Sequence, residues 1–573
     1  MSSSQTLASE EVRAFRPGFD ASVLVWVAAG VVLAFMVLAP LGWLFASSIR
    51  DGSGALTFGN YIEAFTNPLY LGPIGNSLIL ALAVASIAVL VATPLAWLVA
   101  RTNVPHRGLI QALMLATFVT PEFLGAEAWI FLAAPHSGWL NRLWNFSFHA
   151  EGPFNIYTLP GAIFVIGLYS IPYTFTFVLG ALEMMSSEIE DAAATLGAGA
   201  FRTAWHVTLP IALPAIIAGF IMSFLETLGL FGAPAFLLVP AREQVMTTQL
   251  YQFFQFPQRI ELAAAYAIPL LVVTLILLAV QRRLLGKRGY VLVSGKGQRR
   301  RRISLRRWRW PIFALALVPA VLALALPYGA LLATSLLRSW GNGLRWDNLT
   351  LHWYAWALHD NAGARDAMIH SLLYGAGAAT IAVAITSLIA YAVVRRLVRG
   401  VAILGFLCMA PVVVPGIVLA IGFFAAYSHP PVVLYGGAGM LIVAFATRFL
   451  PIAYSNFVSL FNGVHPELEN AARTLGASRL RTLAVITVPI LRSGFIASWL
   501  LVFVPAIREL SAAVFLFTPK TAVMSTMIYD YTDAGNFEAV STLGVLMLVI
   551  TLVIVALARR LSAGTALERS RTI

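Results

Sequence analysis

Residues 188–198 read Glu-Ile-Glu-Asp-Ala-Ala-Ala-Thr-Leu-Gly-Ala, and residues 467–477 read Glu-Leu-Glu-Asn-Ala-Ala-Arg-Thr-Leu-Gly-Ala. The two copies align without a gap, with Glu469 standing 279 positions after Glu190. A repeat period this long in an apolar chain indicates two homologous halves rather than a solenoid of small units. The repeated stretch therefore predicts a chain built from two related halves.

Each copy predicts a short polar helix followed by the next apolar span. Glutamate and alanine favour helix, glycine can supply the left-handed residue that ends it, and proline stands where a new helix can start. An ordinary amphipathic loop would explain one copy, but a gapless duplicate disfavours it. The residues concerned are Glu190, Ala192, Ala193, Gly197 and Pro210 in the first copy, and Glu469, Ala471, Ala472, Gly476 and Pro489 in the second.

The pattern Glu-x-Ala-Ala-x-x-x-Gly, followed after a dozen residues by Pro, resembles the cytoplasmic coupling motif of permease subunits of bacterial binding-protein-dependent ABC importers. In that family the motif forms the helix that docks on the ATP-hydrolysing subunit. Asp191 and Asn470 follow the glutamate at a position where the family varies. The resemblance implies the type I permease fold, an all-α polytopic membrane protein with about twelve transmembrane helices in two six-helix halves. It also implies two copies of an ATPase subunit and an external binding protein, periplasmic or lipid-anchored, as partners.

The composition is that of a polytopic membrane protein, with 59% hydrophobic and only 11% charged residues among 573. The single cysteine, Cys408, excludes an internal disulfide and disfavours a thiolate metal site. The net charge of +13 is explained by Lys and Arg in cytoplasmic loops. Residues 281–310 carry twelve basic residues and no acid, which predicts contact with anionic lipid headgroups. Nucleic-acid binding is disfavoured because no recognition module surrounds this run.

Twelve apolar runs are long enough to cross a bilayer, at about 20 residues each. They fall at 22–47, 76–100, 109–134, 158–182, 211–239, 262–281, 311–337, 369–394, 400–427, 432–461, 490–517 and 539–558. The expected organisation is an N-terminal tail at 1–21, a first permease half at 22–285, a basic linker at 286–310, a second half at 311–562 and a tail at 563–573. No cleavable signal peptide is apparent, so the first span is expected to stay in the mature protein.

The strong basic clusters predict the orientation of these spans. With the N terminus inside, Arg101, Arg107, Arg395, Arg396 and both coupling stretches fall on one side, as the positive-inside rule requires. Both termini are therefore expected in the cytoplasm, with the protein in the bacterial inner membrane.

The first half is about 15 residues longer than the second, because Ser371 follows Ser77 by 294 positions whereas the coupling stretches are 279 apart. The extra residues are expected in the external loop 136–159, where Trp139 and Trp144 lie. This loop could contact an external partner, or it could form an amphipathic cap that lies at the membrane interface.

The chain carries no recognisable site for ATP hydrolysis or other catalysis. The nearest candidate for a phosphate-binding loop, Ser294 to Gly297, has Tyr290 where the loop needs glycine and Gly297 where it needs Ser or Thr. The nine histidines are scattered, so no metal site is predicted. We therefore expect a transport subunit rather than an enzyme, without its own cofactor, with ATP and Mg bound by a separate ATPase.

Four charged residues within predicted spans are candidates for the substrate pathway: Glu226, Arg448, Arg508 and Glu509. Burying an ionised group in lipid costs several kcal/mol on some scales, so such residues are frequently functional. Structural ion pairs are the alternative. A gradient-driven secondary transporter with Glu226 as its coupling site is the competing function, but the duplicated stretch would then have no purpose.

The sequence indicates the cargo less clearly than it indicates the class of transporter. Residues 224–232 and Arg508-Glu509-Leu510 resemble the iron(III) permease branch, which receives ferric ion from a binding protein. Relatives that carry thiamine, phosphonates or polyamines remain alternatives, because such a similarity supports the transport machine more firmly than its cargo.

Overall fold

The computed structural model describes residues 22–185, 188–286, 302–397 and 400–571. The N-terminal tail and most of the basic linker, including residues 287–301, lie outside this part of the chain. The predicted contact of the linker with anionic lipid therefore stays a prediction.

The first half contains fourteen α-helices in the described residues. They are α1 (Ser22–Leu33), α2 (Ala39–Ser48), α3 (Gly59–Thr66), α4 (Pro68–Arg101), α5 (Arg107–Val119), α6 (Glu122–Ala133), α7 (Trp139–Phe148), α8 (Leu159–Met184), α9 (Glu188–Thr195), α10 (Ala200–Thr203), α11 (Leu209–Gly229), α12 (Gly232–Leu238), α13 (Met246–Gln252) and α14 (Ile260–Gly286).

The second half repeats most of this order in its described residues. Its helices are α15 (Arg309–Ala320), α16 (Leu326–Ser335), α17 (His352–Ala355), α18 (Ala362–Val394), α19 (Val401–Met409), α20 (Gly416–Tyr427), α21 (Ala438–Asn462), α22 (Pro466–Thr474), α23 (Arg479–Thr482), α24 (Val488–Ile490), α25 (Arg492–Ile507), α26 (Ala513–Leu516), α27 (Met524–Asp533) and α28 (Phe537–Arg571).

The predicted fold class is confirmed. Among the described residues, nine helices are long and apolar enough to cross a membrane, and three bent pairs raise the number to twelve when each pair counts as one span. Every predicted span overlaps one of these. The third span of each half is broken, by 96° between α5 and α6 and by 113° between α19 and α20. Pro121 and Pro415 stand at the two breaks, and proline disfavours helix in the residue before it.

Four helices widen into a π-helical turn that ends two residues before a proline. Proline lacks an N–H and its ring clashes with the carbonyl four residues earlier, whereas a π turn bonds over five residues and relieves that conflict. Pro210 and Pro489 lie in α11 and α24, which continue directly from such turns, so no separate helix starts at either proline. The turns are Ala34–Leu38 before Pro40, Ala204–Thr208 before Pro210, Val321–Ala325 before Pro327 and Leu483–Thr487 before Pro489.

The first span of each half packs against the other half. Helix α2 packs on α20 of the second half as well as on α14 of its own half, and α16 packs on α6 of the first half as well as on α28 of its own half. Side chains fix both exchanges: the hydroxyls of Tyr328 and Thr120 are 2.7 Å apart, and the hydroxyl of Tyr427 donates to the carbonyl of Phe35. This exchange ties the two halves together.

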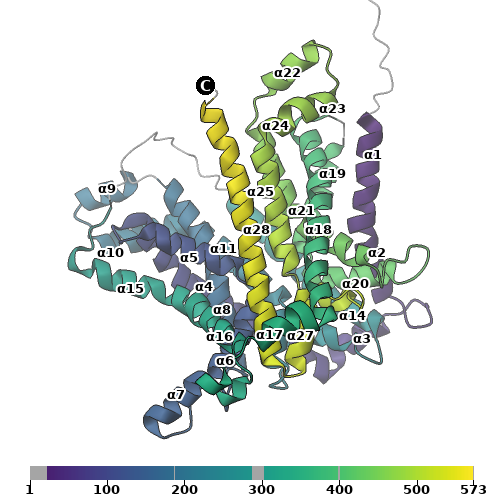
Figure 1. Cartoon of the computed structure of the whole chain (residues 1–573). Coiled ribbons are helices and arrows are strands. Elements are labelled where there is room, and N and C mark those ends of the chain that lie inside the picture. Colours follow the sequence, from purple (N-terminus) through teal and green to yellow (C-terminus); the bar gives the residue numbers. More distant parts are fainter. Residues whose placement is uncertain (1–21, 186–187, 287–301, 398–399, 572–573) are drawn as a thin grey trace, which may run out of the picture.

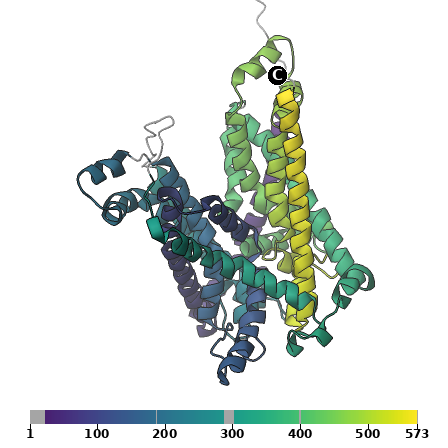
Figure 2. The same cartoon turned by 60° about the vertical axis from the view of Figure 1, so that its left-hand side comes forward.

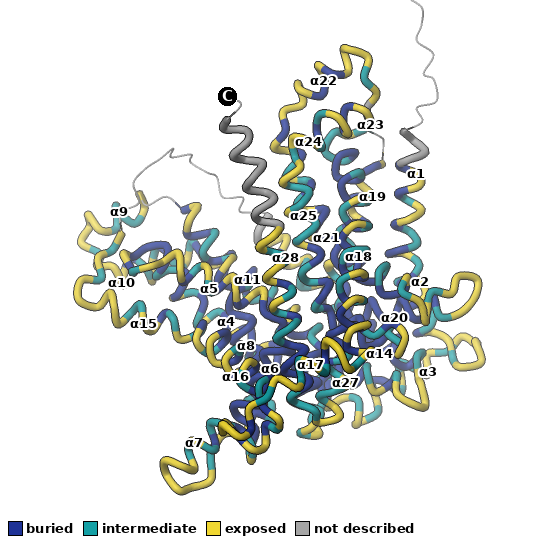
Figure 3. Tube along the Cα trace, viewed as in Figure 1, coloured by how far each residue is buried: buried dark blue, intermediate teal, exposed yellow. Residues whose placement is uncertain are grey.

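The two halves meet at one end of the molecule and diverge at the other (Figures 1 and 2). We call the diverging end, which carries α9 and α22, the coupling face, and the end that carries α3, α7, α17 and α27 the opposite face. Helix α1 begins and α28 ends toward the coupling face. Buried residues concentrate toward the opposite face, whereas α9 and α22 are largely exposed (Figure 3).

The extra length of the first half lies in the predicted loop. Twenty-five residues separate α6 from α8, but only ten separate α20 from α21. They form α7, which projects from the opposite face in Figure 1. Buried Asn141 fixes its base, since its amide donates to the carbonyls of Ala134 at 2.9 Å and Phe154 at 2.7 Å. Contact of α7 with an external partner or with the membrane interface stays a prediction.

Candidate coupling and transport site

The two coupling stretches form the predicted helices, α9 and α22. Gly197 and Gly476 follow them with φ of +83° and +85°, the left-handed conformation that glycine adopts without strain. The N–H of Ala477 donates to the carbonyl of Ala472 at 3.2 Å, and the equivalent bond in the first copy is 3.0 Å. These bonds close the helix ends in the manner of a Schellman motif.

The glutamate of the first copy is bound to the end of α4. Arg101 lies at the last residue of that helix, and its Nε is 2.9 Å from Oε2 of Glu190. The hydroxyl of Thr208 donates to Glu190 at 2.6 Å, and Nη2 of Arg101 donates to the carbonyl of Met185 at 3.4 Å. Arg101 is only 3% exposed, so this ion pair is largely withdrawn from water.

The second copy repeats this arrangement at equivalent positions. Arg395, just after α18, places Nη2 at 2.9 Å from Oε1 of Glu469 and at 3.0 Å from the carbonyl of Val464. The hydroxyl of Thr487 donates to the same carboxylate at 3.3 Å. Tyr391 adds a hydrogen bond to Glu469 at 3.1 Å. We call each set of contacts a coupling anchor. From the sequence, the two arginines predicted only the orientation of the membrane spans. Their contact with the glutamates is seen only in the fold.

The coupling helices present apolar side chains outward. Leu196 and Leu475 occupy the same position in the two copies, and both are 89% exposed. Ile189 and Leu468 also occupy equivalent positions and are 51% and 50% exposed, so each coupling stretch presents the same two apolar side chains outward. Of the predicted alanines, Ala192 and Ala471 are exposed, Ala193 is half-buried and Ala472 is buried.

The structure brings the four predicted intramembrane charges together where the halves meet. Nε of Arg448 on α21 is 3.1 Å from Oε2 of Glu509. Arg508 donates to the carbonyl of Val119 at the end of α5, in the other half. Glu226 on α11 lies within electrostatic range of Arg448, Arg508 and Glu509. Both arginines are therefore already engaged by other groups.

Two further residues with side-chain oxygens belong to this cluster. Neither was predicted from the sequence. Glu122, the first residue of α6, and Tyr173 on α8 lie within electrostatic range of Glu226. Over the described residues, neither Glu122 nor Glu226 has an ion-pair or hydrogen-bond partner. The signal was present, since Glu122 and the completely buried Glu127 are acids inside the predicted span 109–134.

An aromatic plug of four side chains joins the halves toward the opposite face. Tyr251 on α13 and Tyr529 on α27 meet edge to face, with ring centroids 5.6 Å apart. Phe515 lies 5.6 Å from Tyr251, and Phe236 lies 5.8 Å from Tyr529. The two tyrosines are 278 positions apart and the two phenylalanines 279, so each pair occupies equivalent positions. The pseudo-two-fold axis between the halves therefore passes through the plug.

Beyond the plug, α27 presents exposed acids. Asp530 follows Tyr529 directly, and Asp533 ends the helix. Partial burial, with a smaller contribution from the Asp533 charge, raises the pKa of Asp530 to about 6. Asp530 is therefore mostly ionised at neutral pH and mostly protonated below pH 6.

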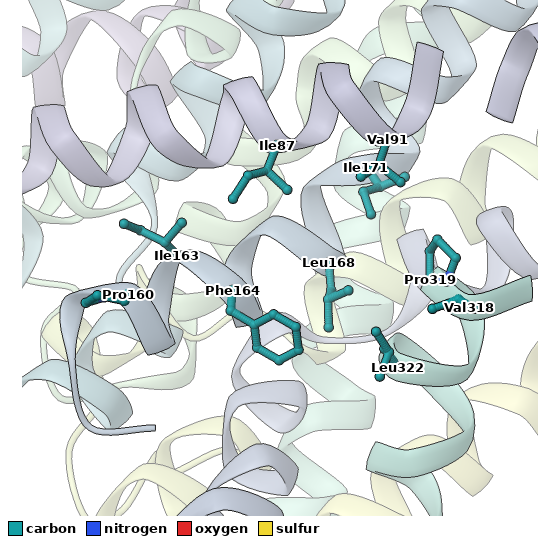
Figure 4. Close-up of a pocket in the computed structure, with 10 residues that line it drawn as sticks. All are labelled: Ile87, Val91, Pro160, Ile163, Phe164, Leu168, Ile171, Val318, Pro319 and Leu322. Carbon is teal, nitrogen blue, oxygen red and sulfur yellow. The ribbon is translucent and has the colours of Figure 1, made fainter. Parts of the chain in front are cut away.

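An apolar cavity lies away from this axis. It holds about 310 Å³ between α4, α8 and the end of α15 (Figure 4). Its lining is wholly apolar, so it offers nothing to an ion. The lining residues are Ile87, Val91, Pro160, Ile163, Phe164, Leu168, Ile171, Val318, Pro319 and Leu322. Across the described ranges, no three His, Cys, Asp or Glu side chains are grouped closely enough to hold a metal ion.

Comparison with known families accounts for the duplicated architecture. The chain matches the family described as "Binding-protein-dependent transport system inner membrane component" twice, over residues 92–288 and 383–566. The chain belongs to this family. Each match contains one coupling helix and its anchor arginine. The permease thus has the fused two-half form of a membrane transport subunit.

Two relatives are similar along most of the permease, and a third is similar along less than half of it. It is 26% identical to the ferric transport system permease protein FbpB of Actinobacillus pleuropneumoniae, over 94% of this chain and 78% of that protein. It is 27% identical to a putative ferric transport system permease protein of Haemophilus influenzae, over 86% and 77%. A putative 2-aminoethylphosphonate permease of Salmonella paratyphi A is 26% identical over 41% of this chain and 88% of its own length.

Proposed function

We propose that this permease imports iron(III), which it receives from an external binding protein, driven by two copies of a separate ATPase that bind ATP and Mg. The ATPases would dock on α9 and α22, whose exposed Leu196 and Leu475 supply equivalent contacts. The coupling face is then cytoplasmic, and both termini lie in the cytoplasm. The positive-inside rule supports this orientation, because Arg101 and Arg395 both lie at that face.

Alternating access is the proposed mechanism. The halves diverge at the coupling face and are joined by the aromatic plug toward the other side, so this conformation corresponds to the inward-open state. ATP binding between the ATPases would draw α9 and α22 together and open the plug toward the binding protein. Hydrolysis would return the permease to the present conformation. The cargo can bias this cycle only by binding one state more tightly than the other.

The observation that carries the cargo assignment is the pair of unpartnered carboxylates, Glu122 and Glu226. In the described structure both nearby arginines are already engaged, Arg448 by Glu509 and Arg508 by a backbone carbonyl. The groups left available are thus carboxyl oxygens, and the phenol of Tyr173 adds a further oxygen. Ionised carboxylates attract a hard cation and repel an anion such as a phosphonate, and a phenol oxygen can serve as a further ligand to the cation. The similarity to ferric permeases supports the same choice.

Removing the carboxylate of Glu226 is expected to lower iron uptake severalfold. Glu226→Gln keeps the size of the side chain but loses the charge that attracts a cation. The measurement is uptake of radioactive iron into vesicles that contain the permease, its ATPase and a ferric-loaded binding protein. Glu151→Gln, which removes an exposed charge on the loop after α7, is the matched control. Unchanged uptake in Glu226→Gln, or uptake of phosphonate instead of iron, would contradict the assignment.

A further inference from the structure

Helices α4 and α18 each start near one functional region and end at another. At 34 and 33 residues they are each about 50 Å long, at roughly 1.5 Å per residue. Their carboxyl-terminal ends carry Arg101 and Arg395, the arginines of the two coupling anchors. A movement of either coupling helix therefore acts directly on the end of one long helix.

The other end of each long helix holds the short helix that carries a plug tyrosine. The N–H of Met246, the first residue of α13, donates to the hydroxyl of Ser77 on α4 at 2.7 Å. The N–H of Met524, the first residue of α27, donates to the hydroxyl of Ser371 on α18 at 2.8 Å. Both serines are almost completely buried, at 4% and 3% exposed. Hydrogen bonds in such apolar surroundings are costly to break without a replacement.

Neighbouring contacts repeat this connection in both halves. The side-chain amide of Asn76 donates to the carbonyl of Gln244 at 3.0 Å, and Nδ1 of His370 is 3.0 Å from the carbonyl of Ala522. Asn76 and His370 directly precede the two serines. Each long helix thus binds its plug helix through two adjacent residues.

The plug helices are also joined to the helix ends beside the charged cluster. The hydroxyl of Thr247 donates to the carbonyl of Leu230, just after α11, at 2.7 Å. The hydroxyl of Ser525 donates to the carbonyl of Glu509, just after α25, at 2.7 Å. A shift of α13 or α27 would therefore change the plug and the cluster together.

We propose that α4 and α18 are two transmission helices that connect the coupling anchors to the aromatic plug, with Ser77 and Ser371 as positioning residues for the plug tyrosines. This inference rests on the proposed ATP-driven cycle. It goes beyond that cycle by naming the bonds through which closure at α9 and α22 opens the plug. Proximity alone does not establish such a pathway. Loss of plug opening when the hydrogen bonds of Ser77 and Ser371 are removed does establish it.

The test measures both ends of the transmission helices in one protein. The single cysteine allows a Cys408→Ser background in which spin labels are placed at chosen sites. One pair, Gln252→Cys with Asp530→Cys, reports on the plug from exposed positions, and the other, Gly199→Cys with Ser478→Cys, reports on the coupling helices. Distances are measured in lipid, in complex with the ATPase, with and without a non-hydrolysable ATP analogue.

In the labelled background, nucleotide is expected to shorten the coupling distance and lengthen the plug distance. In Ser77→Ala/Ser371→Ala, the coupling distance should still shorten, but the lengthening at the plug should be lost. The control is Ser86→Ala/Ser387→Ala, which removes hydroxyls of the same two helices that donate within their own helix, and it should behave like the background.

The possible failures separate the two proposals. If the background responds to nucleotide but the serine variant opens its plug equally well, transmission through these joints is wrong and the importer function stands. If the coupling distance also stops responding in the variant, the serines do not act downstream of the coupling helices, and the inference is again contradicted. If the background itself shows no response with the ATPase bound, the proposed function fails and the transmission with it.

Discussion

Arg395→Gln should reduce ATP-driven transport at least about tenfold. The substitution leaves the carboxylate of Glu469 almost completely buried, at 6% exposed, without its counter-ion. Removing one partner of a buried pair costs about 3–5 kcal/mol, and 1.4 kcal/mol already corresponds to a factor of ten. The hydrogen bonds from Tyr391 and Thr487 recover part of this loss. The measurement is cargo uptake together with ATPase activity in reconstituted vesicles.

The neighbouring Arg396→Gln is the matched control, because Arg396 is exposed and lies one residue further along. It should transport at close to the unmodified rate. The double variant Arg395→Gln/Glu469→Gln should transport better than Arg395→Gln alone, since it removes the uncompensated charge. A double variant that is as impaired as the single variant would show that the ion pair is not what positions α22.

Gly476→Pro should uncouple transport from ATP hydrolysis. Proline requires φ near −65°, but Gly476 has φ of +85° and its N–H donates to the carbonyl of Arg473 at 3.0 Å. The substitution would therefore reshape the end of α22, against which the ATPase is proposed to move. We expect ATPase activity to persist while uptake is lost, and the equivalent Gly197→Pro should behave alike. Both activities are measured on the same vesicles.

A graded series separates backbone conformation from the size of the side chain. A Cβ at position 476 would meet nothing within 4 Å, so Gly476→Ala suffers only the left-handed conformation, at about 1–2 kcal/mol. Gly476→Asn should be milder still, because asparagine tolerates that conformation. Uptake should therefore fall in the order Gly, Asn, Ala, Pro. Equal uptake in all four proteins would contradict the role of this helix end.

The spans and coupling helices could be predicted because their signals are local. A run of about 20 apolar residues is visible without knowing its neighbours, and a glycine after a polar helix predicts its left-handed end. Even the broken spans had a local cause at Pro121 and Pro415. The bend angles of 96° and 113° have no such local cause, because they depend on what the two segments of each span pack against.

The coupling anchors could be predicted only in part. Both glutamates and both arginines were singled out, but for different reasons, and 89 residues separate Arg101 from Glu190. Their contact requires the ends of α4 and α9 to meet, which only the fold provides. Ser77 and Ser371 were likewise visible as a repeated pair of serines. Nothing in the sequence indicated that they accept hydrogen bonds from Met246 and Met524.

Contacts between the halves left the least trace in the sequence. Apolar faces of membrane helices resemble one another, so nothing in the sequence marks that α2 packs on α20 of the other half as well as on α14 of its own half. The plug tyrosines lie in ordinary short helices, and an aromatic residue in an apolar chain is unremarkable. The missed Glu122 is different, because an acid inside a predicted span is a signal that single-sequence reasoning can use.

The central claim is that this permease couples ATP hydrolysis at α9 and α22 to import of iron(III). The most direct measurement is the ATPase activity of the permease reconstituted in lipid with its ATPase, titrated with binding protein loaded with ferric ion, a phosphonate or a polyamine. We predict stimulation by the ferric-loaded form alone. Stimulation by another loaded form would contradict the cargo, and an ATPase that does not bind the permease would contradict the coupling itself.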